Sequence, residues 1–252
     1  MVARYETKTV EHLGLVAGMF DELGIGELID QFIPQDKDQR FVTIGQAVKA
    51  MVINGLGFTN RRLYLAPRFF KNKPTDQLIG PGIKAEHLND GAPSKALDRL
   101  HQFGVTELFT IIAQQAATRL ELNPKIAHLD SSSFHLDGSY NSGDDEPVDG
   151  VIQIKRGYSR DNRPDLNQVI LELIAENTAG LPLLMRPLSG NASDKTSFQE
   201  AVLRQAGQLQ NAGVEVLVTD SAGSGHPANP EPNGRYLGNG CPCDPDAGEE
   251  AA

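Results

Sequence analysis

The sequence predicts a mixed α and β fold, in which a helical N-terminal domain is followed by a mixed β-sheet. Between Val10 and Leu122 the apolar residues recur at helical spacing. Asn123-Pro124 then ends this pattern, because proline cannot continue a helix. Beyond it, short apolar and β-branched runs alternate with turn residues, as strands do. We therefore predict a helical domain over residues 1–123, a sheet domain over residues 124–222 and an irregular tail over residues 223–252.

The N-terminal domain contains start and stop signals for several helices. Gly24 and Gly26 interrupt the first apolar stripe, which begins near Leu13. Thr43 is a plausible N-cap for a helix that ends around Gly55. Further helices are predicted from Ala92 to Phe103 and from Val105 to Leu122.

The most basic window of the chain lies between Asn60 and Lys73, where aromatic residues are interleaved with cations. One interpretation is a face that contacts DNA; the other is a solvated helix whose aromatic side packs inward. The pattern alone favours neither. The cations that would contact DNA are Arg61, Arg62, Arg68 and Lys71.

The sheet domain is predicted to contain five strands and one long helix. The helix runs from Asp194 to about Gln210, and the strands are Ile126–Leu136, Val151–Ser159, Gln168–Ala175, Leu183–Leu188 and Val214–Thr219. Three strands in hairpin succession, a returning strand, a helix and a last strand beside the first give a mixed sheet. This order is that of a ribonuclease H-like core.

Two strands of this domain lead into an aspartate followed by serine. Ile126–Leu129 precedes Asp130, and Val214–Thr219 precedes Asp220. Such runs are typical of buried strands with an acid at the carboxyl end. If the two strands are neighbours, Asp130 and Asp220 could converge within metal-bridging distance. For either aspartate alone, a turn acceptor at a strand end is the alternative.

Composition restricts the other classes of function. The formal net charge of -10 argues against a simple nucleic-acid binder, although a local basic face can still act on DNA. The chain has no apolar run near ~20 residues and no secretory signal at its start, so we expect a cytoplasmic protein. Cys241 and Cys243 are too close for an easy disulfide and lack further zinc ligands.

Three stretches resemble a DDE transposase of a bacterial insertion sequence, the cut-and-paste group with a ribonuclease H-like core. They are Leu129–Ser133, the more specific run Gly157-Tyr158-Ser159-Arg160-Asp161-Asn162-Arg163-Pro164-Asp165-Leu166, and Leu181–Thr196, followed by Thr219-Asp220-Ser221. The resemblance implies that Asp130 and Asp220 are catalytic residues that bind two Mg²⁺ (or Mn²⁺) ions. It also implies DNA with transposon terminal repeats as the partner, and a homodimer is a further expectation.

A basic stretch between the two aspartates is expected to flank the site. On the functional interpretation its cations grip phosphates of the transposon end; on the other, they belong to a solvated hairpin with Asp161 and Asp165 as partners. The residues concerned are Lys155, Arg156, Arg160 and Arg163.

The chain departs from the resemblance after Asp220. Members of the group carry a third carboxylate within a Tyr, Arg, Glu and Lys signature, and residues 223–252 contain no such pattern. We therefore expect an incomplete, C-terminally truncated core that is inactive. Two alternatives remain: a non-catalytic DNA-binding remnant that inhibits the intact transposase, and a metal-dependent phosphoesterase or nuclease with a different third ligand.

Overall fold

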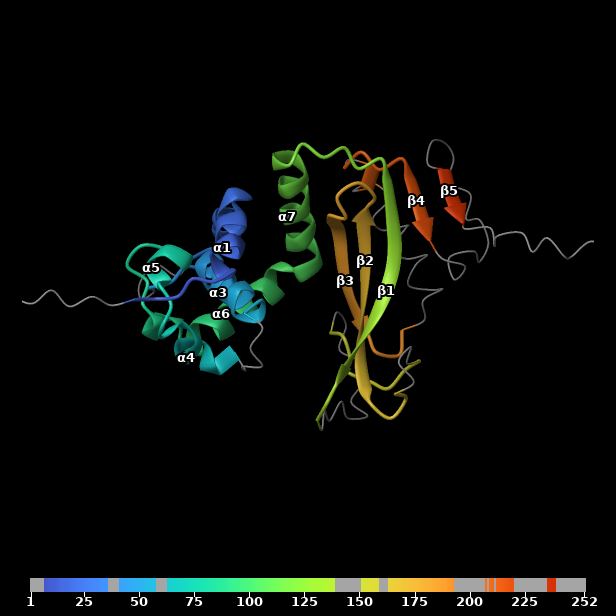
Figure 1. Cartoon of the computed structure of the whole chain (residues 1–252). Helices are drawn as coiled ribbons and strands as arrows, with labels where there is room; N and C mark the ends of the chain where they lie inside the picture. The colour runs from blue at the N-terminus through green and yellow to red at the C-terminus, as the bar shows by residue number, and fades with distance from the viewer. Residues whose placement is uncertain are drawn as a thin grey trace, which may run out of the picture. The chain divides into compact units, whose positions relative to one another are not determined.

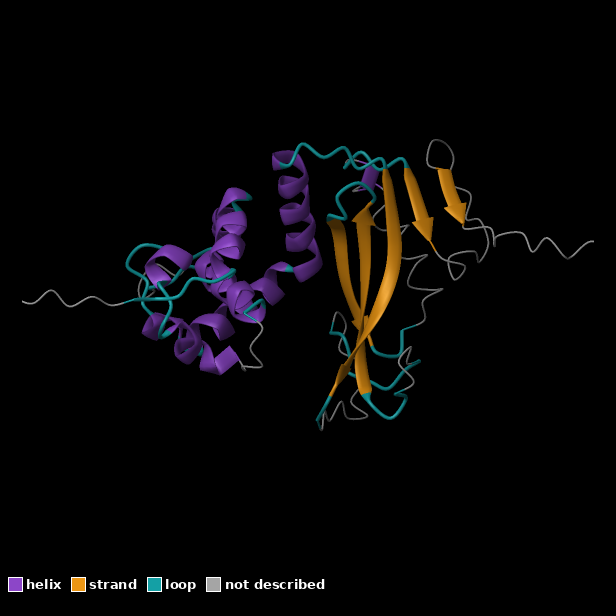
Figure 2. Ribbon diagram, in the orientation of Figure 1, coloured by secondary structure: helices purple, strands orange, loops and turns teal. Residues whose placement is uncertain are grey.

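The computed structural model comprises two compact units, Met1–Leu108 and Phe109–Ala252, which are described separately (Figure 1). The structure describes residues 7–35, 41–57, 63–138, 151–158, 163–192, 207, 209–210, 212–219 and 235–238. It has a helical N-terminal region followed by a mixed sheet, which confirms the predicted fold class (Figure 2). Within the described residues, every helix is too short or too polar to span a membrane.

Unit 1 is built from short helices around a small apolar core. Leu13, Ile29, Ile53 and Phe70 are among its fully buried side chains. The helices are α1 (Leu13–Glu22), α2 (Ile25–Phe32), α3 (Ile44–Gly55), η1 (Leu63–Leu65), α4 (Ala66–Phe70), α5 (Thr75–Leu78), η2 (Ala85–Leu88) and α6 (Gly91–Phe103).

Helix α3 begins where the sequence predicts. The Thr43 side chain accepts a hydrogen bond from the Gln46 backbone N–H, and the Gln46 side chain accepts one from the Thr43 N–H. This reciprocal pair satisfies two backbone donors that the first turn of a helix leaves open. The Lys49 side chain is buried and lies 2.7 Å from the Asp21 carboxylate, which compensates the burial of its charge.

Unit 2 contains a five-stranded mixed sheet and helix α7 (Val105–Arg119), which begins in unit 1. The strands are β1 (Ile126–Leu136), β2 (Asn167–Glu176), β3 (Pro182–Ser189), β4 (Val216–Thr219) and β5 (Arg235–Gly238). Their order is β3-β2-β1-β4-β5; β1, β2 and β3 pair antiparallel, whereas β4 pairs parallel to β1 and β5 parallel to β4. The prediction that β4 lies beside β1 is confirmed.

One face of the sheet carries the core of unit 2. Ala127 and Leu129 of β1 are buried there, as are Ile174 of β2, Leu184 of β3 and Leu217 of β4. Because side chains alternate along a strand, the intervening residues of β1 point to the other face, where Ile126, His128, Asp130 and Ser132 are exposed. Helix α7 reaches this core: Thr110 and Gln114 share a small cavity with Leu183 and Leu184.

One strand prediction in unit 2 needs correction. The segment Val151–Ser159 is not a strand over its described residues 151–158, where only Lys155 forms an isolated bridge with Gln168. Within the predicted tail, residues 235–238 form strand β5. The two compact units meet at Leu108, within α7, and the change from helix to strand lies between Arg119 and Ile126. Most of the helix predicted over 194–210 lies outside the described residues.

Candidate functional site

Asp130 lies in the middle of β1 and not at its carboxyl end. The strand continues for six more residues to Leu136, because β2 pairs with it as far as Asn167. The carboxyl-end position predicted for Asp130 is therefore wrong for β1 itself. The Asp130 side chain is exposed, and its Oδ1 accepts a hydrogen bond of 2.7 Å from the Ser131 backbone N–H. This contact restricts the orientation of the carboxylate.

Asp130 nevertheless follows the last residue of β1 that is described as paired with the parallel strand β4. The described part of β4 ends at Thr219, which is the register partner of Leu129. Asp130 is thus the first residue of β1 beyond its described pairing with β4. Asp220 follows Thr219 in the sequence and lies outside the described residues.

Polar side chains surround Asp130 on the exposed face. His128 and Ser132 lie two residues before and after it, and His128 Nε2 lies 3.1 Å from the Asn177 side-chain oxygen. By strand alternation His128 shares the exposed face with Asp130, whereas His135 lies on the other face. Among the described residues, no group of three His, Cys, Asp or Glu side chains is placed to hold a metal ion.

A buried ion pair lies on the opposite face, and the sequence reasoning missed it. Glu172 of β2 is fully buried opposite Ser131, and its Oε2 accepts a hydrogen bond of 2.9 Å from Arg186 Nε on β3. Strand alternation places Glu172 on the same face as Ile170 and Ile174, and this pattern could have indicated that Glu172 is buried. Its partner Arg186 follows only from the register between β2 and β3.

A second buried acid closes the hairpin between β2 and β3. Glu176 accepts backbone hydrogen bonds from Thr178, Ala179 and Leu181. Burial acts to raise the pKa of Glu176, but these backbone donors together outweigh it, and the pKa lies below its ordinary value. Glu176 therefore stabilises a turn and is not available for chemistry at Asp130.

Gly157 and Tyr158 belong to the most specific stretch of the resemblance, and they contact β2 and the residue that follows β3. We call the three residues Gly157, Gln168 and Gly190 the glutamine clamp. Buried Gln168 donates from Nε2 to the carbonyl oxygens of Tyr158, at 3.1 Å, and of Gly190, at 2.7 Å. A Cβ at Gly157 would collide with the Gly190 carbonyl oxygen, and one at Gly190 with the Gln168 carbonyl oxygen. The two glycines are thus needed for packing.

The basic residues predicted to flank Asp130 lie further along the sheet. Lys155 bridges Gln168, which pairs with His135, five residues beyond Asp130 on β1. At the usual rise of a strand this separates the two positions by about 17 Å. Arg156 is exposed, and Arg160 lies outside the described residues.

Arg163 has a local partner. Its Nε and Nη2 donate to the two carboxylate oxygens of Asp165 at 3.0 and 2.9 Å. The hydrogen bonds from Arg163 hold the pKa of Asp165 below its ordinary value, and the charges of Arg163 and Arg156 act in the same direction. The partner anticipated on the solvated-hairpin interpretation is therefore present, at an exposed position.

The basic window of unit 1 has both an apolar and a cationic side. Phe69 and Phe70 are buried and pack edge to face, with ring centroids 4.8 Å apart. Arg68 and Lys71 are exposed beside them. The inward packing of the aromatic residues agrees with the solvated-helix interpretation, and the exposed cations remain compatible with DNA contact. Arg61 and Arg62 lie outside the described residues.

In the comparison with known proteins, one family model matches part of the chain. The model of a domain of unknown function, DUF4277, matches residues 5–114, which cover nearly all of unit 1. No curated protein matches the sequence. A solved structure, "Mos1 transposase paired-end complex with left transposon end", is similar with a TM-score of 0.26 and 11% identity, over 76% of this chain and 56% of that chain. The chain thus spans about half the length of that transposase, and a similarity this low carries no argument about function.

Proposed function

We propose that this chain derives from a transposase that cuts and joins DNA strands at transposon ends with the help of divalent cations. The observation that carries the proposal is the parallel pairing of β1 with β4. Leu129 lies opposite Thr219, and the residues next in sequence are Asp130 and Asp220. In each of the two neighbouring parallel strands, the same register position is thus followed by an aspartate in the sequence. The resemblance to DDE transposases requires two aspartates in such a relation.

The residue types suit Mg²⁺ or Mn²⁺. Both cations prefer carboxylate oxygens and keep several water ligands, and Asp130 stands on an exposed face where water is available. A bound pair of cations would supply Lewis-acid stabilisation to the attacking and leaving oxygens of a phosphodiester. Asp130 would hold its cation at a fixed place, because β1 is paired with β2 there and the Ser131 N–H orients the carboxylate.

The basic residues of both units would bind the DNA backbone. Duplex DNA carries one negative charge per about 1.7 Å of axis, so a duplex lying along β1 could contact both Asp130 and the cations about 17 Å away. The exposed ion pair between Arg163 and Asp165 is no obstacle, since such pairs contribute little in water. We propose that Lys155, Arg156, Arg160 and Arg163 bind phosphates, and that Arg61, Arg62, Arg68 and Lys71 bind the terminal repeat. We further propose a homodimer that holds both transposon ends.

Asp130 and Asp220 correspond to two of the three carboxylates that the resemblance implies, and residues 223–252 lack the signature that carries the third. An incomplete ligand set would leave the cations under-coordinated. For this chain alone we therefore propose DNA binding without strand cleavage. The alternative function, a DNA-binding remnant that inhibits an intact transposase, rests on the same observation.

The test compares DNA binding, cation binding and strand cleavage. We expect terminal-repeat duplex to bind with an affinity that falls steeply with salt, and Mn²⁺ binding, followed by electron paramagnetic resonance, to be lost in Asp130→Asn. Asp137→Asn is the matched control for Mn²⁺ binding, because Asp137 is an exposed aspartate just beyond β1 and should not change that binding.

Each other outcome has a definite meaning. Nicking of the duplex with Mg²⁺ that is lost in Asp130→Asn and kept in Asp137→Asn would overturn the proposed inactivity. Equal cleavage of DNA without any terminal repeat would favour a nuclease. DNA binding that is absent or insensitive to salt would contradict the whole proposal.

A further inference from the structure

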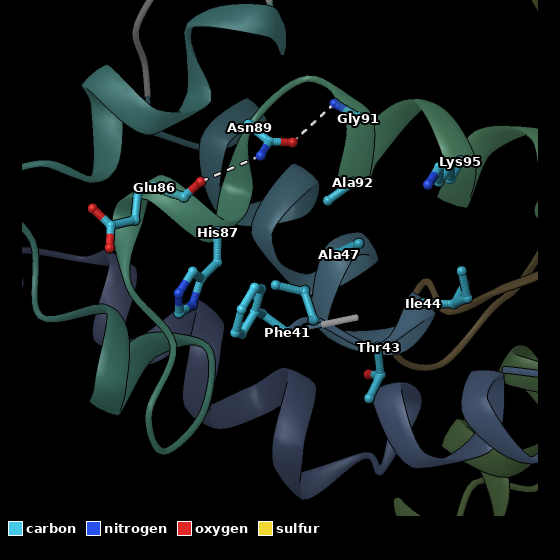
Figure 3. A pocket seen from close by; sticks show the side chains of 11 residues that line it. Phe41, Thr43, Ile44, Ala47, Glu86, His87, Asn89, Gly91, Ala92 and Lys95 are labelled. Carbon is cyan, nitrogen blue, oxygen red and sulfur yellow. Dashed lines mark hydrogen bonds between the residues drawn. The ribbon is translucent and has the colours of Figure 1, made fainter. Parts of the chain in front are cut away.

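A pocket of about 320 Å³ opens in unit 1, between the first turn of α3 and the segment that leads from η2 into α6 (Figure 3). Its volume is in the range of small-molecule sites, which begins at roughly 300 Å³. None of its lining residues belongs to the basic window or to the surroundings of Asp130. They are Phe41, Val42, Thr43, Ile44, Ala47, Glu86, His87, Asn89, Gly91, Ala92 and Lys95.

An exposed aromatic ring forms one side of the pocket. Phe41 is 76% exposed, and it stacks on the His87 imidazole with ring centroids 4.5 Å apart and an interplanar angle of 9°. His87 is itself held in place, because its Nδ1 accepts the Lys84 backbone N–H at 3.2 Å. The neutral imidazole consequently carries its proton on Nε2. The stack thus presents a flat surface whose orientation is already set before a ligand binds.

The remaining walls add an apolar floor and a cation. Figure 3 shows Ala47 and Ala92 between the Phe41 ring and Lys95, whereas the Glu86 carboxylate points away from the pocket. The Glu86 carboxylate lies 3.9 Å from Lys84 Nζ, which partly balances its charge. The pocket therefore offers a planar aromatic surface, a small apolar floor and one positive charge, which suit a flat ring that carries an anionic group.

We propose that this pocket binds one nucleotide, with its base stacked on Phe41 and its phosphate near Lys95. The proposal rests on the DNA-binding function inferred above, which makes an unpaired nucleotide of bound DNA the expected source. A base within a duplex is stacked on both faces, so only a base that has left the stack can reach a protein ring. A free nucleotide has the same chemistry and is distinguished by the test.

The first experiment measures preference for an unpaired base. Fluorescence anisotropy would compare a labelled fully paired duplex with the same duplex carrying one unpaired adenine. We expect the wild-type chain to bind the second duplex more tightly, and Phe41→Ala to remove this preference, a loss of about fivefold or more. Phe41→Trp should keep the preference. Leu15→Ala is the control, because Leu15 is an 80% exposed apolar residue of the same unit outside the pocket.

The second experiment tests the cation. Lys95→Gln should weaken binding of the duplex with the unpaired adenine. It should also reduce the slope of log affinity against log salt concentration by about the contribution of one phosphate contact. Lys8→Gln is the matched control, since Lys8 is an exposed lysine of unit 1 that does not line the pocket. Thermal melting of every variant would separate lost binding from lost folding.

The outcomes distinguish this inference from the proposed function. If both duplexes bind equally well and Phe41→Ala behaves as wild type, the pocket proposal is wrong while DNA binding stands. If neither duplex binds, DNA binding fails. In that case Phe41-dependent binding of free deoxyadenosine monophosphate would support a nucleotide site with a free ligand, and its absence would overturn the site as well.

Discussion

The carboxylates on the two faces of the sheet in unit 2 differ in burial and in hydrogen-bond partners. On the core face, Glu172 is fully buried against Arg186, and Glu176 is buried against three backbone N–H groups. On the other face, Asp130 is exposed and accepts a hydrogen bond from the adjacent Ser131 N–H. Acids with specific, enclosed partners therefore stabilise the sheet, whereas Asp130 is open to solvent, as the proposed cation ligand has to be.

The largest expected effect is the loss of the buried ion pair. Glu172→Ala should lower the free energy of unfolding by about 3–5 kcal/mol, because the Arg186 side chain, which is 13% exposed, loses its carboxylate partner. Urea denaturation would measure this change. The double variant Glu172→Leu with Arg186→Met should recover most of the loss. A cost below about 1 kcal/mol for Glu172→Ala would contradict the assigned role.

The glutamine clamp should be the next most sensitive site. Gly157→Ala places a methyl group against the Gly190 carbonyl oxygen and the Gln168 amide, and we expect a loss of about 2–3 kcal/mol. Gly207→Ala is the control within unit 2, because nothing lies within 4 Å of its added Cβ. It should be neutral or slightly stabilising. Equal melting temperatures for the two variants would show that the contacts of the clamp are not rigid.

A smaller and pH-dependent effect is expected at Glu176. Its pKa is lowered in the folded state, so it contributes stability that is present above its ordinary pKa of 4.5 and is lost as the pH falls through the folded value. Glu176→Gln should cost about 1–2 kcal/mol at neutral pH. The variant should also lose less stability than wild type below about pH 4.5. Parallel denaturation curves across this range would refute the assignment.

The smallest effect on stability is expected at Asp130. Asp130→Asn should change the free energy of unfolding by less than about 0.5 kcal/mol, because the side chain is exposed and asparagine can still accept the Ser131 N–H. Chemical denaturation beside Mn²⁺ binding would measure both properties on one sample. A large loss of stability would place Asp130 with Glu172 and Glu176 among the structural acids.

Much of the sheet was predictable from local patterns. The runs around Leu129, Ile174, Leu184 and Val218 combine apolar or β-branched residues with flanking turn residues, and the structure has strands at all four. Segment 151–159 has the same composition but forms only one bridge, because its described residues contact β2 and β3 through Gln153, Lys155 and Tyr158. Strand β5 was missed, since four residues in a Gly- and Pro-rich tail give no periodic signal.

The amino-acid sequence alone specifies the change from helices to strands, the cap of α3 and the face of β1 on which Asp130 lies, because these depend on periodicity and neighbouring residues. Contacts between distant residues needed the folded structure: the Glu172–Arg186 pair, the clamp at Gln168 and the stacking of Phe41 on His87. Their partners are set by strand register and helix packing, which join residues 14 to 46 positions apart. No local pattern in the chain encodes which of those residues will meet.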